Sequence, residues 1–339
     1  MAVKEQPVTI IVSGRNSAST IRPCLESIAG QNWPIDEILV FDNGSSDGSQ
    51  DIVRNIAQNS QIPIRLIDGG ADGFLCSAYN RGAQMSKADI LVLCHSDGMI
   101  PSSDELRKLV FPLVTDPTAS ASYPRLLMPR KIWDKFPFWQ KFLFVRAVDS
   151  TAHSKCAIFD AIRKDVYLKA GGFDEKLFTA NCGYGGEDND AQLRFSRFGR
   201  QLMTEAKVVH LHNLTPNYGF RNYLAFRALL ARTYGKQLIW QRGVAAKSDL
   251  LFFVRPILSF LPLAMSSFYI WGGDLGCMAL GSAVVFQFLF AFANSRKMFT
   301  SKTTLLDLRI LLVVPVGVFM IYYETFWFFH GLFTRGNRR

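Results

Sequence analysis

Short apolar runs alternate with helical patterns through about the first 120 residues, and this alternation limits the possible folds more than any other feature. Strands that alternate with helices at this spacing indicate a mostly parallel sheet with helices on both faces. We therefore predict an α/β domain of the Rossmann-like type. The predicted strands cover residues 8–12, 37–42, 64–68 and 90–94, and the predicted helices cover residues 19–29, 47–58 and 73–86.

Residues 121–150 interrupt this pattern with proline, tryptophan and phenylalanine among basic residues. Such a stretch is typical of an irregular loop, which either lies at a membrane interface or covers an active site. Beyond it, the sequence predicts a strand and a helix within 155–175, a helix over 186–199 and a strand over 208–213. The predicted α/β domain therefore spans residues 1–220.

The composition changes after the α/β domain. Residues 221–249 are amphipathic and basic, which predicts a helix at a membrane interface. Residues 250–339 contain long apolar segments, and roughly 20 helical residues suffice to cross a hydrocarbon core. We therefore predict an all-α transmembrane region with two to three spanning helices. Its apolar segments cover residues 250–271, 275–294 and 310–333.

The distribution of charge favours a membrane surface over a nucleic acid as the partner. The formal net charge is +10, and the basic residues gather beside the apolar segments, as in RKMFTSK and TRGNRR. The sequence shows no helix-turn-helix or zinc-finger spacing, so we expect no nucleic-acid partner. The six scattered cysteines favour a reducing compartment, and the start of the chain lacks the apolar core of a signal peptide. We expect a multi-pass membrane protein with a cytosolic catalytic domain.

The number of membrane spans stays open. A hairpin of the first two apolar segments would leave the basic loop at residues 295–302 inside, as the positive-inside tendency requires. A third full crossing would place the basic end of the chain outside. Three spans follow from length alone, and two spans with one re-entrant or interfacial segment follow from charge.

Acidic residues follow the ends of predicted strands or open a predicted helix. Asp42 ends the second strand before a Gly- and Ser-rich turn, and Asp97 follows the fourth strand. Glu187, Asp188 and Asp190 open the helix after the Gly-rich stretch CGYGG. One acid at a helix N-terminus commonly complements the helix dipole, but three together also suggest a rigidly placed general base. Since ligands gather at the carboxyl ends of parallel strands, we expect a site there.

Three sequence blocks together resemble the family 2 glycosyltransferases, over roughly residues 7–225. The blocks are VTIIVSGRNSASTIRPCLESIAGQNWPIDEILVFDNGSSDGS, GFLCSAYNRGAQMSKADILVLCHSDG and GGFDEKLFTANCGYGGEDNDAQLRFSRFG. The resemblance implies a GT-A fold and transfer of a sugar from a nucleotide-diphosphate donor, with inversion at the anomeric carbon. It also implies a divalent metal, Mg²⁺ or Mn²⁺, which acts as a Lewis acid on the leaving diphosphate.

The resemblance assigns nucleotide contacts to residues of the first two blocks. Asp42 matches the family acid that contacts the nucleoside base, and Ser13 and Asn16 stand near the nucleotide at the end of the first strand. Ser13 occupies a position where proline is usual in the family. The family segment that faces the nucleotide from a helix matches Asn80, Arg81 and Gly82.

The resemblance also assigns a metal site and a catalytic base. The Asp-x-Asp of the family falls where Asp97 supplies the second acid, which binds the metal, and His95 replaces the first, which serves ribose. An imidazole can accept a ribose hydroxyl or bind Mn²⁺. Asp188 matches the family base. His210 or His212 matches a late histidine that completes the metal coordination, with a purely structural histidine as the alternative.

Several functions remain open at this point. A membrane-bound transferase is expected to extend a lipid-linked saccharide or a related glycan at the cytosolic face. A polyprenyl-phosphate glycosyltransferase is an alternative, although HSDGMIP differs from that subgroup's Asp-Ala-Asp-Leu-Gln-His-Pro-like stretch. QLIWQRG only weakly resembles the Gln-x-x-Arg-Trp of processive synthases, and SGRNSAST is a poor match to the Gly-rich loop of a nucleotidyltransferase. The missing first acid keeps a catalytically silent binding or assembly protein as an alternative.

Overall fold

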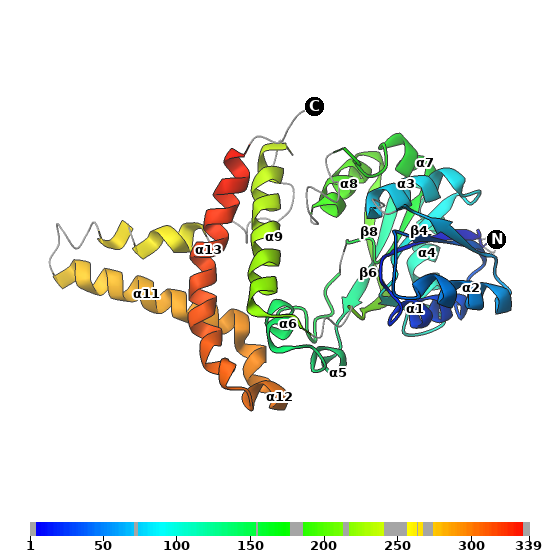
Figure 1. Cartoon of the computed structure of the whole chain (residues 1–339). Helices are drawn as coiled ribbons and strands as arrows, with labels where there is room; N and C mark the ends of the chain where they lie inside the picture. The colour runs from blue at the N-terminus through cyan, green and yellow to red at the C-terminus, as the bar shows by residue number, and fades with distance from the viewer. Residues whose placement is uncertain are drawn as a thin grey trace. The chain divides into compact units, whose positions relative to one another are not determined.

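The structure is a computed structural model of the whole chain, and it divides into two compact units that are described separately (Figure 1). The first unit comprises residues 1–129, 149–183 and 187–214, and the second comprises residues 130–148, 184–186 and 215–339. The residues that the structure describes are 5–70, 74–153, 155–176, 186–212, 217–240, 256–262, 264–266 and 274–334.

The first unit is built on an eight-stranded mixed sheet with the strand order β3-β2-β1-β4-β7-β6-β8-β5. The pairs β3-β2, β2-β1, β1-β4 and β6-β8 are parallel, while β4-β7, β7-β6 and β8-β5 are antiparallel. The strands are β1 (Val8–Gly14), β2 (Ile35–Asp42), β3 (Ile64–Asp68), β4 (Ile90–His95), β5 (Gly98–Met99), β6 (Ala119–Leu127), β7 (Phe159–Arg163) and β8 (Arg200–His210).

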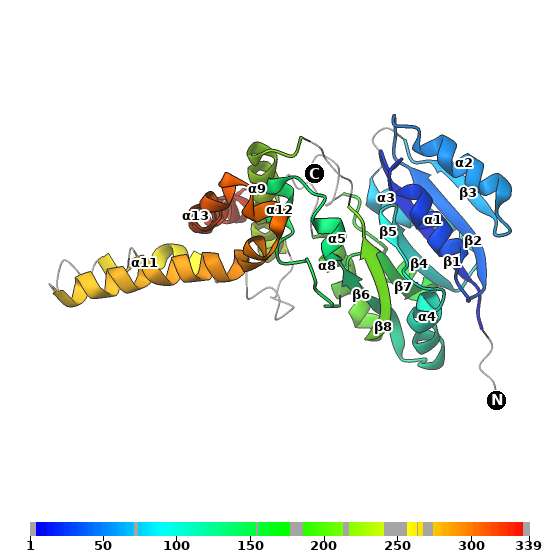
Figure 2. The same cartoon turned by 90° about the horizontal axis from the view of Figure 1, so that it is seen from below.

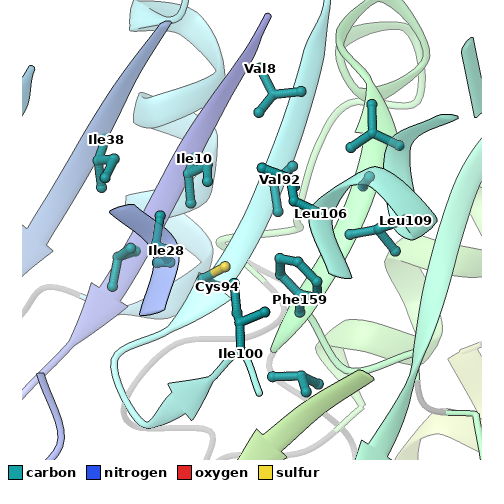
Figure 3. Close-up of a cluster of buried hydrophobic side chains, with 14 of the residues drawn as sticks. Val8, Ile10, Ile28, Ile38, Val92, Cys94, Ile100, Leu106, Leu109 and Phe159 are labelled. Atoms are coloured by element: carbon teal, nitrogen blue, oxygen red, sulfur yellow. The ribbon is translucent and has the colours of Figure 1, made fainter. Parts of the chain in front are cut away.

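Helices cover both faces of this sheet, as the sequence predicts. One face packs against α1 (Ile21–Ala29), α2 (Ser49–Asn59) and α4 (Glu105–Thr115) (Figure 2). The other face packs against α3 (Leu75–Met85), α7 (Lys164–Lys169) and α8 (Glu187–Phe195). Buried apolar side chains from alternate strand positions fill the first interface, where Val92 and Phe159 lie near Leu106 and Leu109 (Figure 3).

The N-terminal half of the predicted pattern is confirmed, but two predictions further along the chain are wrong. Residues 121–127 lie in strand β6 rather than in an irregular loop, and β8 begins at Arg200 rather than at residue 208. The sequence of β6 hides its burial, because Ser120 and Ser122 are buried polar residues. Their hydroxyls donate to the carbonyl oxygens of Gly199 (3.1 Å) and Leu109 (2.7 Å), which makes their burial tolerable.

The second unit is helical over its described residues. Helices α9 and α13 pack closely at two glycines, Gly235 and Gly331. A Cβ at Gly235 would clash with the Phe328 carbonyl, and a Cβ at Gly331 would clash with the Arg232 carbonyl, so only glycine allows this approach. The helices are α5 (Arg130–Trp133), α6 (Phe138–Leu143), α9 (Phe220–Trp240), α11 (Asp274–Ser295), α12 (Lys302–Leu305) and α13 (Val313–Phe333).

Two helical stretches of this unit are long and apolar enough to cross a membrane. They cover Asp274–Thr300 and Leu308–Phe333, with mean hydropathies of 2.0 and 1.7. Much of their apolar surface is exposed, with Leu275 78% and Leu289 60% accessible. Of the predicted segment at 250–271, the structure describes residues 256–262 and 264–266, which are helical. The predicted interfacial helix corresponds to α9 up to Trp240, and its remainder lies outside the described residues.

Candidate active site

Four parallel strands end side by side at one edge of the sheet of the first unit. The register of these strands places Ser13 beside His95, and Asp42 beside both Gly14 and Asp68. Every one of these residues is the last or next-to-last in its strand. Because the carboxyl ends of parallel strands form the usual ligand site of open α/β sheets, this edge is the candidate active site.

The loop after β1 and the loop after β2 are joined by hydrogen bonds. Asn16 donates its backbone N–H to Ser45 Oγ (2.8 Å), and its Oδ1 accepts from the backbone N–H of Ser46 (2.9 Å). Ser13 Oγ accepts from Nδ2 of Asn43 (3.0 Å). Asn16 has a φ of 51°, a left-handed conformation that asparagine tolerates better than most residues. The predicted nucleotide residues Ser13 and Asn16 therefore lie in one connected loop pair.

Asp42 anchors the second of these loops. Its Oδ2 accepts from the backbone N–H of Ser45 (3.0 Å) and from Nε2 of Gln50 (2.7 Å). The side chain is buried, with the whole residue only 6% exposed. Asp42 thus shapes the turn at the mouth of β2, and its predicted contact with the nucleoside base remains a prediction.

Asn80 uses both ends of its side-chain amide inside the protein. Its Oδ1 accepts from the Tyr167 hydroxyl (2.8 Å) and from the backbone N–H of Phe173 (2.9 Å). Its Nδ2 donates to the Phe173 carbonyl (2.8 Å) and to Oε1 of Glu175 (2.7 Å). Asn80 therefore ties α3 to the segment after α7, and its predicted nucleotide contact is untested.

The two residues after Asn80 have different surroundings. Arg81 donates to the carbonyl of Asp68 at the end of β3 (3.1 Å), and its guanidinium lies 5.3 Å from the centre of the Phe41 ring. Gly82 lies where a Cβ would come within 2.7 Å of the Ile11 side chain, so its lack of a side chain lets α3 approach β1. Arg81 thus lies at the candidate edge, while Gly82 has a clear packing reason.

Two histidines and one aspartate come together beside β4. Potential ligand atoms of His95, Asp97 and His210 all lie within 4.8 Å of one another. The antiparallel pairing of Gly98 with His210 brings the end of β8 to the loop after β4. Nε2 of His210 lies 3.1 Å from Oδ2 of Asp97, and the inaccessible Nε2 of His95 has no hydrogen-bond partner among the described residues. This donor set suits a divalent transition-metal ion.

The environment of this trio favours a neutral His95 and an ionised Asp97. Burial lowers the pKa of His95 to about 4. Burial alone would raise the pKa of Asp97, but the charge of His210 and its hydrogen bond outweigh that effect and lower it below its usual range. Neutral imidazole and ionised carboxylate are the protonation states that bind metals.

His212 stacks on the trio rather than belonging to it. Its ring centre lies 3.5 Å from that of His210, and its backbone adopts a φ of 50°. Burial, followed by the proximity of His210, lowers the pKa of His212 well below its usual value. Of the two histidines offered by the sequence, the geometry therefore favours His210 as the metal ligand.

Asp188 opens α8 and has a second acid, Asp160, in its surroundings. The Oδ1 atoms of both carboxyls are inaccessible and lack hydrogen-bond partners in the described part of the chain. Burial raises the pKa of Asp188 well above its usual value, and the charges of Glu187 and Asp160 raise it further. A carboxylate with raised basicity is suited to accept a proton.

The sequence reasoning missed Asp160. It is the second residue of β7, is 3% exposed, and accepts a hydrogen bond from the backbone N–H of Ala157 through Oδ2 (2.9 Å). Burial raises its pKa to about 8. A single acid within the apolar run AIFDAI was the available signal, because an unpaired acid is rarely buried without a reason.

Comparison with known proteins finds similarity to glycosyltransferases. Residues 9–169 match the family model described as Glycosyl transferase family 2. The O-antigen chain rhamnosyltransferase RfbN of Salmonella typhimurium is 26% identical over 231 residues, which cover 64% of this chain and 70% of that protein. The glycosyltransferase AglE of Haloferax volcanii is 33% identical over 92 residues, covering 26% of this chain and 30% of AglE.

A solved structure shows the same fold. The mannosyltransferase PcManGT from Pyrobaculum calidifontis, in complex with GDP-Man and Mn²⁺, superposes with a TM-score of 0.57 at 20% sequence identity. The alignment covers 98% of this chain and 89% of that chain. The predicted family, fold and enzyme class are thus confirmed. The chain is a glycosyltransferase with a GT-A fold, and its residues 9–169 match the family model of glycosyl transferase family 2.

Proposed function

We propose that the enzyme transfers a sugar from a nucleotide-diphosphate donor to an acceptor hydroxyl, with inversion at the anomeric carbon. The observation that carries this proposal is the meeting of His95, Asp97 and His210 at the carboxyl edge of the sheet. A divalent ion held there would neutralise charge on the donor diphosphate and stabilise it as a leaving group. The binding of GDP-Man and Mn²⁺ by PcManGT is consistent with this assignment.

The trio fits a metal ion by chemistry as well as by position. His95 offers a buried Nε2 that no described residue occupies, and Asp97 offers an ionised oxygen. Mg²⁺ prefers an all-oxygen shell, whereas Mn²⁺ accepts imidazole more readily. We therefore assign Mn²⁺ as the preferred ion and Mg²⁺ as the weaker one. His212 would support the position of His210 through their ring contact.

The nucleotide would lie along the joined loops after β1 and β2. Asp42 would contact the nucleoside base, and Ser13 and Asn16 would line its path toward the diphosphate. Arg81, beside the end of β3, would add a positive charge at the same edge. Asn80 would act through the segment that it holds at Phe173 and Glu175, and Gly82 by allowing α3 to pack closely.

Asp188 would act as the general base. As the acceptor oxygen bonds to the anomeric carbon, the bond from that carbon to the diphosphate oxygen breaks on the opposite face. The proton of the acceptor hydroxyl passes to a carboxylate oxygen of Asp188, so charge and atoms balance in one displacement. Inversion follows because no covalent glycosyl-enzyme forms.

A lipid-linked saccharide or a related glycan is the proposed acceptor, reached at the cytosolic face of a membrane. The two apolar helical stretches with exposed surfaces support a membrane location, and the name of RfbN supports a polysaccharide product. A polyprenyl-phosphate acceptor is the alternative. A catalytically silent binding or assembly protein is the non-enzymatic alternative. It is motivated by His95, which stands where the first acid of the Asp-x-Asp is expected.

A ligand-binding and turnover screen tests the proposal. The full chain is mixed with a panel of nucleotide sugars and either Mn²⁺ or Mg²⁺, and melting temperature and donor consumption are measured. We expect a metal-dependent stabilisation by at least one donor, and turnover that Asp188→Asn abolishes without abolishing the stabilisation. Binding without turnover in the unaltered protein would instead support the silent alternative, and no stabilisation by any donor would refute the donor site.

A further inference from the structure

A cavity in the helical unit contains charged residues that the sugar-transfer chemistry does not use. It has a volume of about 170 Å³ and is lined by residues of α9, α13 and the segment after α6. Helices α9 and α13 lie side by side (Figure 1). A single water needs roughly 10–15 Å³ of such space, so the cavity can hold a polyatomic group. Its lining residues include Arg146, Arg227 and Glu324, and the same three residues line an adjoining cavity of about 60 Å³.

The described residues that line this cavity carry a net positive charge. Arg227 on α9 and Glu324 on α13 form an ion pair, with Nε and Nη2 of the arginine 2.7 and 2.6 Å from Oε1 of the glutamate. Arg146 forms no hydrogen bond or ion pair with any residue that the structure describes. Among the described lining residues, two cations against one anion leave one positive charge, and Arg146 is the cation without a described partner.

The position of Glu324 indicates that the charged residues of this cavity have a functional role. It lies in the apolar stretch Leu308–Phe333, and its side chain is only 7% exposed. Ionisable residues within such stretches are costly and commonly mark a binding site or pathway. The Arg227 guanidinium at the cavity wall shares its charge with Glu324, so an arriving anion would meet one arginine that is already paired and Arg146, which has no described partner.

Four of the six other lining residues are apolar, which points to an amphiphilic occupant. Leu230, Ala231, Pro256 and Phe328 line the larger cavity together with the hydroxyl-bearing Tyr234 and Thr325. Helix α11 carries exposed leucine and phenylalanine side chains along its length. Basic pockets between apolar helices are typical binding sites for lipid head groups, and paired guanidinium groups match the oxygens of a phosphate.

We propose that this cavity binds the phosphate group of a membrane lipid, with Arg146 and Arg227 as its ligands. The inference concerns binding alone, so it stands whether the sugar acceptor is lipid-linked or a free glycan. Glu324 competes with the phosphate for Arg227 and so weakens the site. A loss of positive charge at Arg146 and a loss of negative charge at Glu324 must therefore act in opposite directions.

The test measures lipid binding by the purified full chain in neutral detergent. Dioleoyl phosphatidic acid, dioleoyl phosphatidylcholine and inorganic phosphate are titrated separately, and bound lipid is counted by native mass spectrometry. Arg146→Gln should weaken binding of phosphatidic acid by about tenfold, the effect of losing one charge-assisted hydrogen bond. Glu324→Gln should strengthen it, and Lys302→Gln, which removes a charge from the same unit outside the cavity, should leave it unchanged.

Each other result counts against the inference. Equal losses in Arg146→Gln and Lys302→Gln would show general charge attraction instead of a site. Equal binding of phosphatidic acid and phosphatidylcholine by the unaltered protein would exclude recognition of the anionic phosphate. Inorganic phosphate that displaces phosphatidic acid at equal concentration would assign the site to a soluble anion and overturn its lipid part. Because Arg146 is exposed, its variant is expected to fold, and retained sugar-nucleotide stabilisation would confirm that.

Discussion

Asp97 and Asp188 are carboxylates of the same unit, and their surroundings drive their pKa values in opposite directions. Asp97 faces two histidines, and His210 lowers its pKa despite burial. Asp188 faces two acids, and burial together with Glu187 and Asp160 raises its pKa. One environment holds a carboxylate ionised for a cation, and the other gives a carboxylate greater affinity for a proton. Such divergence separates the binding and proton-transfer roles of otherwise identical groups.

The largest effect should come from replacing Asp188, the carboxylate with the greater affinity for a proton. Asp188→Asn keeps the size of the side chain but cannot accept the proton, so we expect kcat to fall by about 10³-fold. Sugar-nucleotide binding should survive, since the metal trio is intact. The matched control is Asp190→Asn on the same helix, whose carboxylate pairs with Arg194 at 2.5 Å. A similar loss of kcat in both variants would show that the helix, not the base, had been damaged.

Asp97, the ionised carboxylate of the pair, should control metal affinity. Asp97→Asn removes the only carboxylate of the trio. Losing a residue that merely supports a metal ligand weakens metal binding by up to about 10²-fold, so we expect the loss of a ligand to raise the Kd for Mn²⁺ by at least that factor. Isothermal titration with Mn²⁺ measures this, and removal of metal with EDTA should reproduce the loss of activity. Asp36→Asn, an exposed acid at the other end of β2, is the control. Unchanged Mn²⁺ affinity in Asp97→Asn would remove Asp97 from the metal site.

Asp160 offers a way to sharpen the comparison through pH. Its pKa is raised from 3.8 to about 8, so the folded state prefers it protonated. Its contribution to stability is fully present below about pH 4 and is lost as pH rises toward about 8. Asp160→Asn mimics the protonated form, and its melting temperature relative to the unaltered protein should therefore increase across that window.

The same variant should alter the pH profile of kcat. With the Asp160 charge gone, one of the influences that raise the pKa of Asp188 is removed, so the acidic limb should move to lower pH. The control Asp165→Asn removes an exposed acid whose pKa its Lys169 hydrogen bond lowers, so it should leave that limb in place. An acidic limb that is identical in Asp160→Asn and the unaltered protein would separate Asp160 from the base.

Local patterns in the sequence were sufficient to predict Asp97 and Asp188 as site residues, but not the contact between His210 and Asp97. Asp97 follows a strongly apolar strand, and Asp188 opens an acidic helix, so each was visible from its neighbours in the chain. The contact of His210 with Asp97 depends on pairing between β5 and β8, strands more than 100 residues apart in sequence. Only two residues form β5, too few for any periodicity to reveal it.

The fold was predictable to a similar degree. Strands buried on both faces, such as β1 and β4, are continuous apolar runs and were found. Strand β8 alternates buried and exposed residues along a sheet edge, and Lys207 and Glu205 among them obscured its first part. Asn80 shows the limit for single sites, because its sequence position predicts a nucleotide contact while its amide is fully engaged with Tyr167, Phe173 and Glu175.

The smallest effect should come from His95, where the sequence departs from its family. His95→Asp adds a second carboxylate to the trio while removing an imidazole, and the buried site has no described hydrogen-bond partner to lose at Nε2. We expect activity with Mn²⁺ to stay similar, and activity with Mg²⁺ to rise relative to it, because oxygen ligands favour Mg²⁺. The ratio of the two activities at saturating metal measures this preference. A large loss with both ions would show that His95 performs a task that a carboxylate cannot, and would make it the more specialised partner of Asp97.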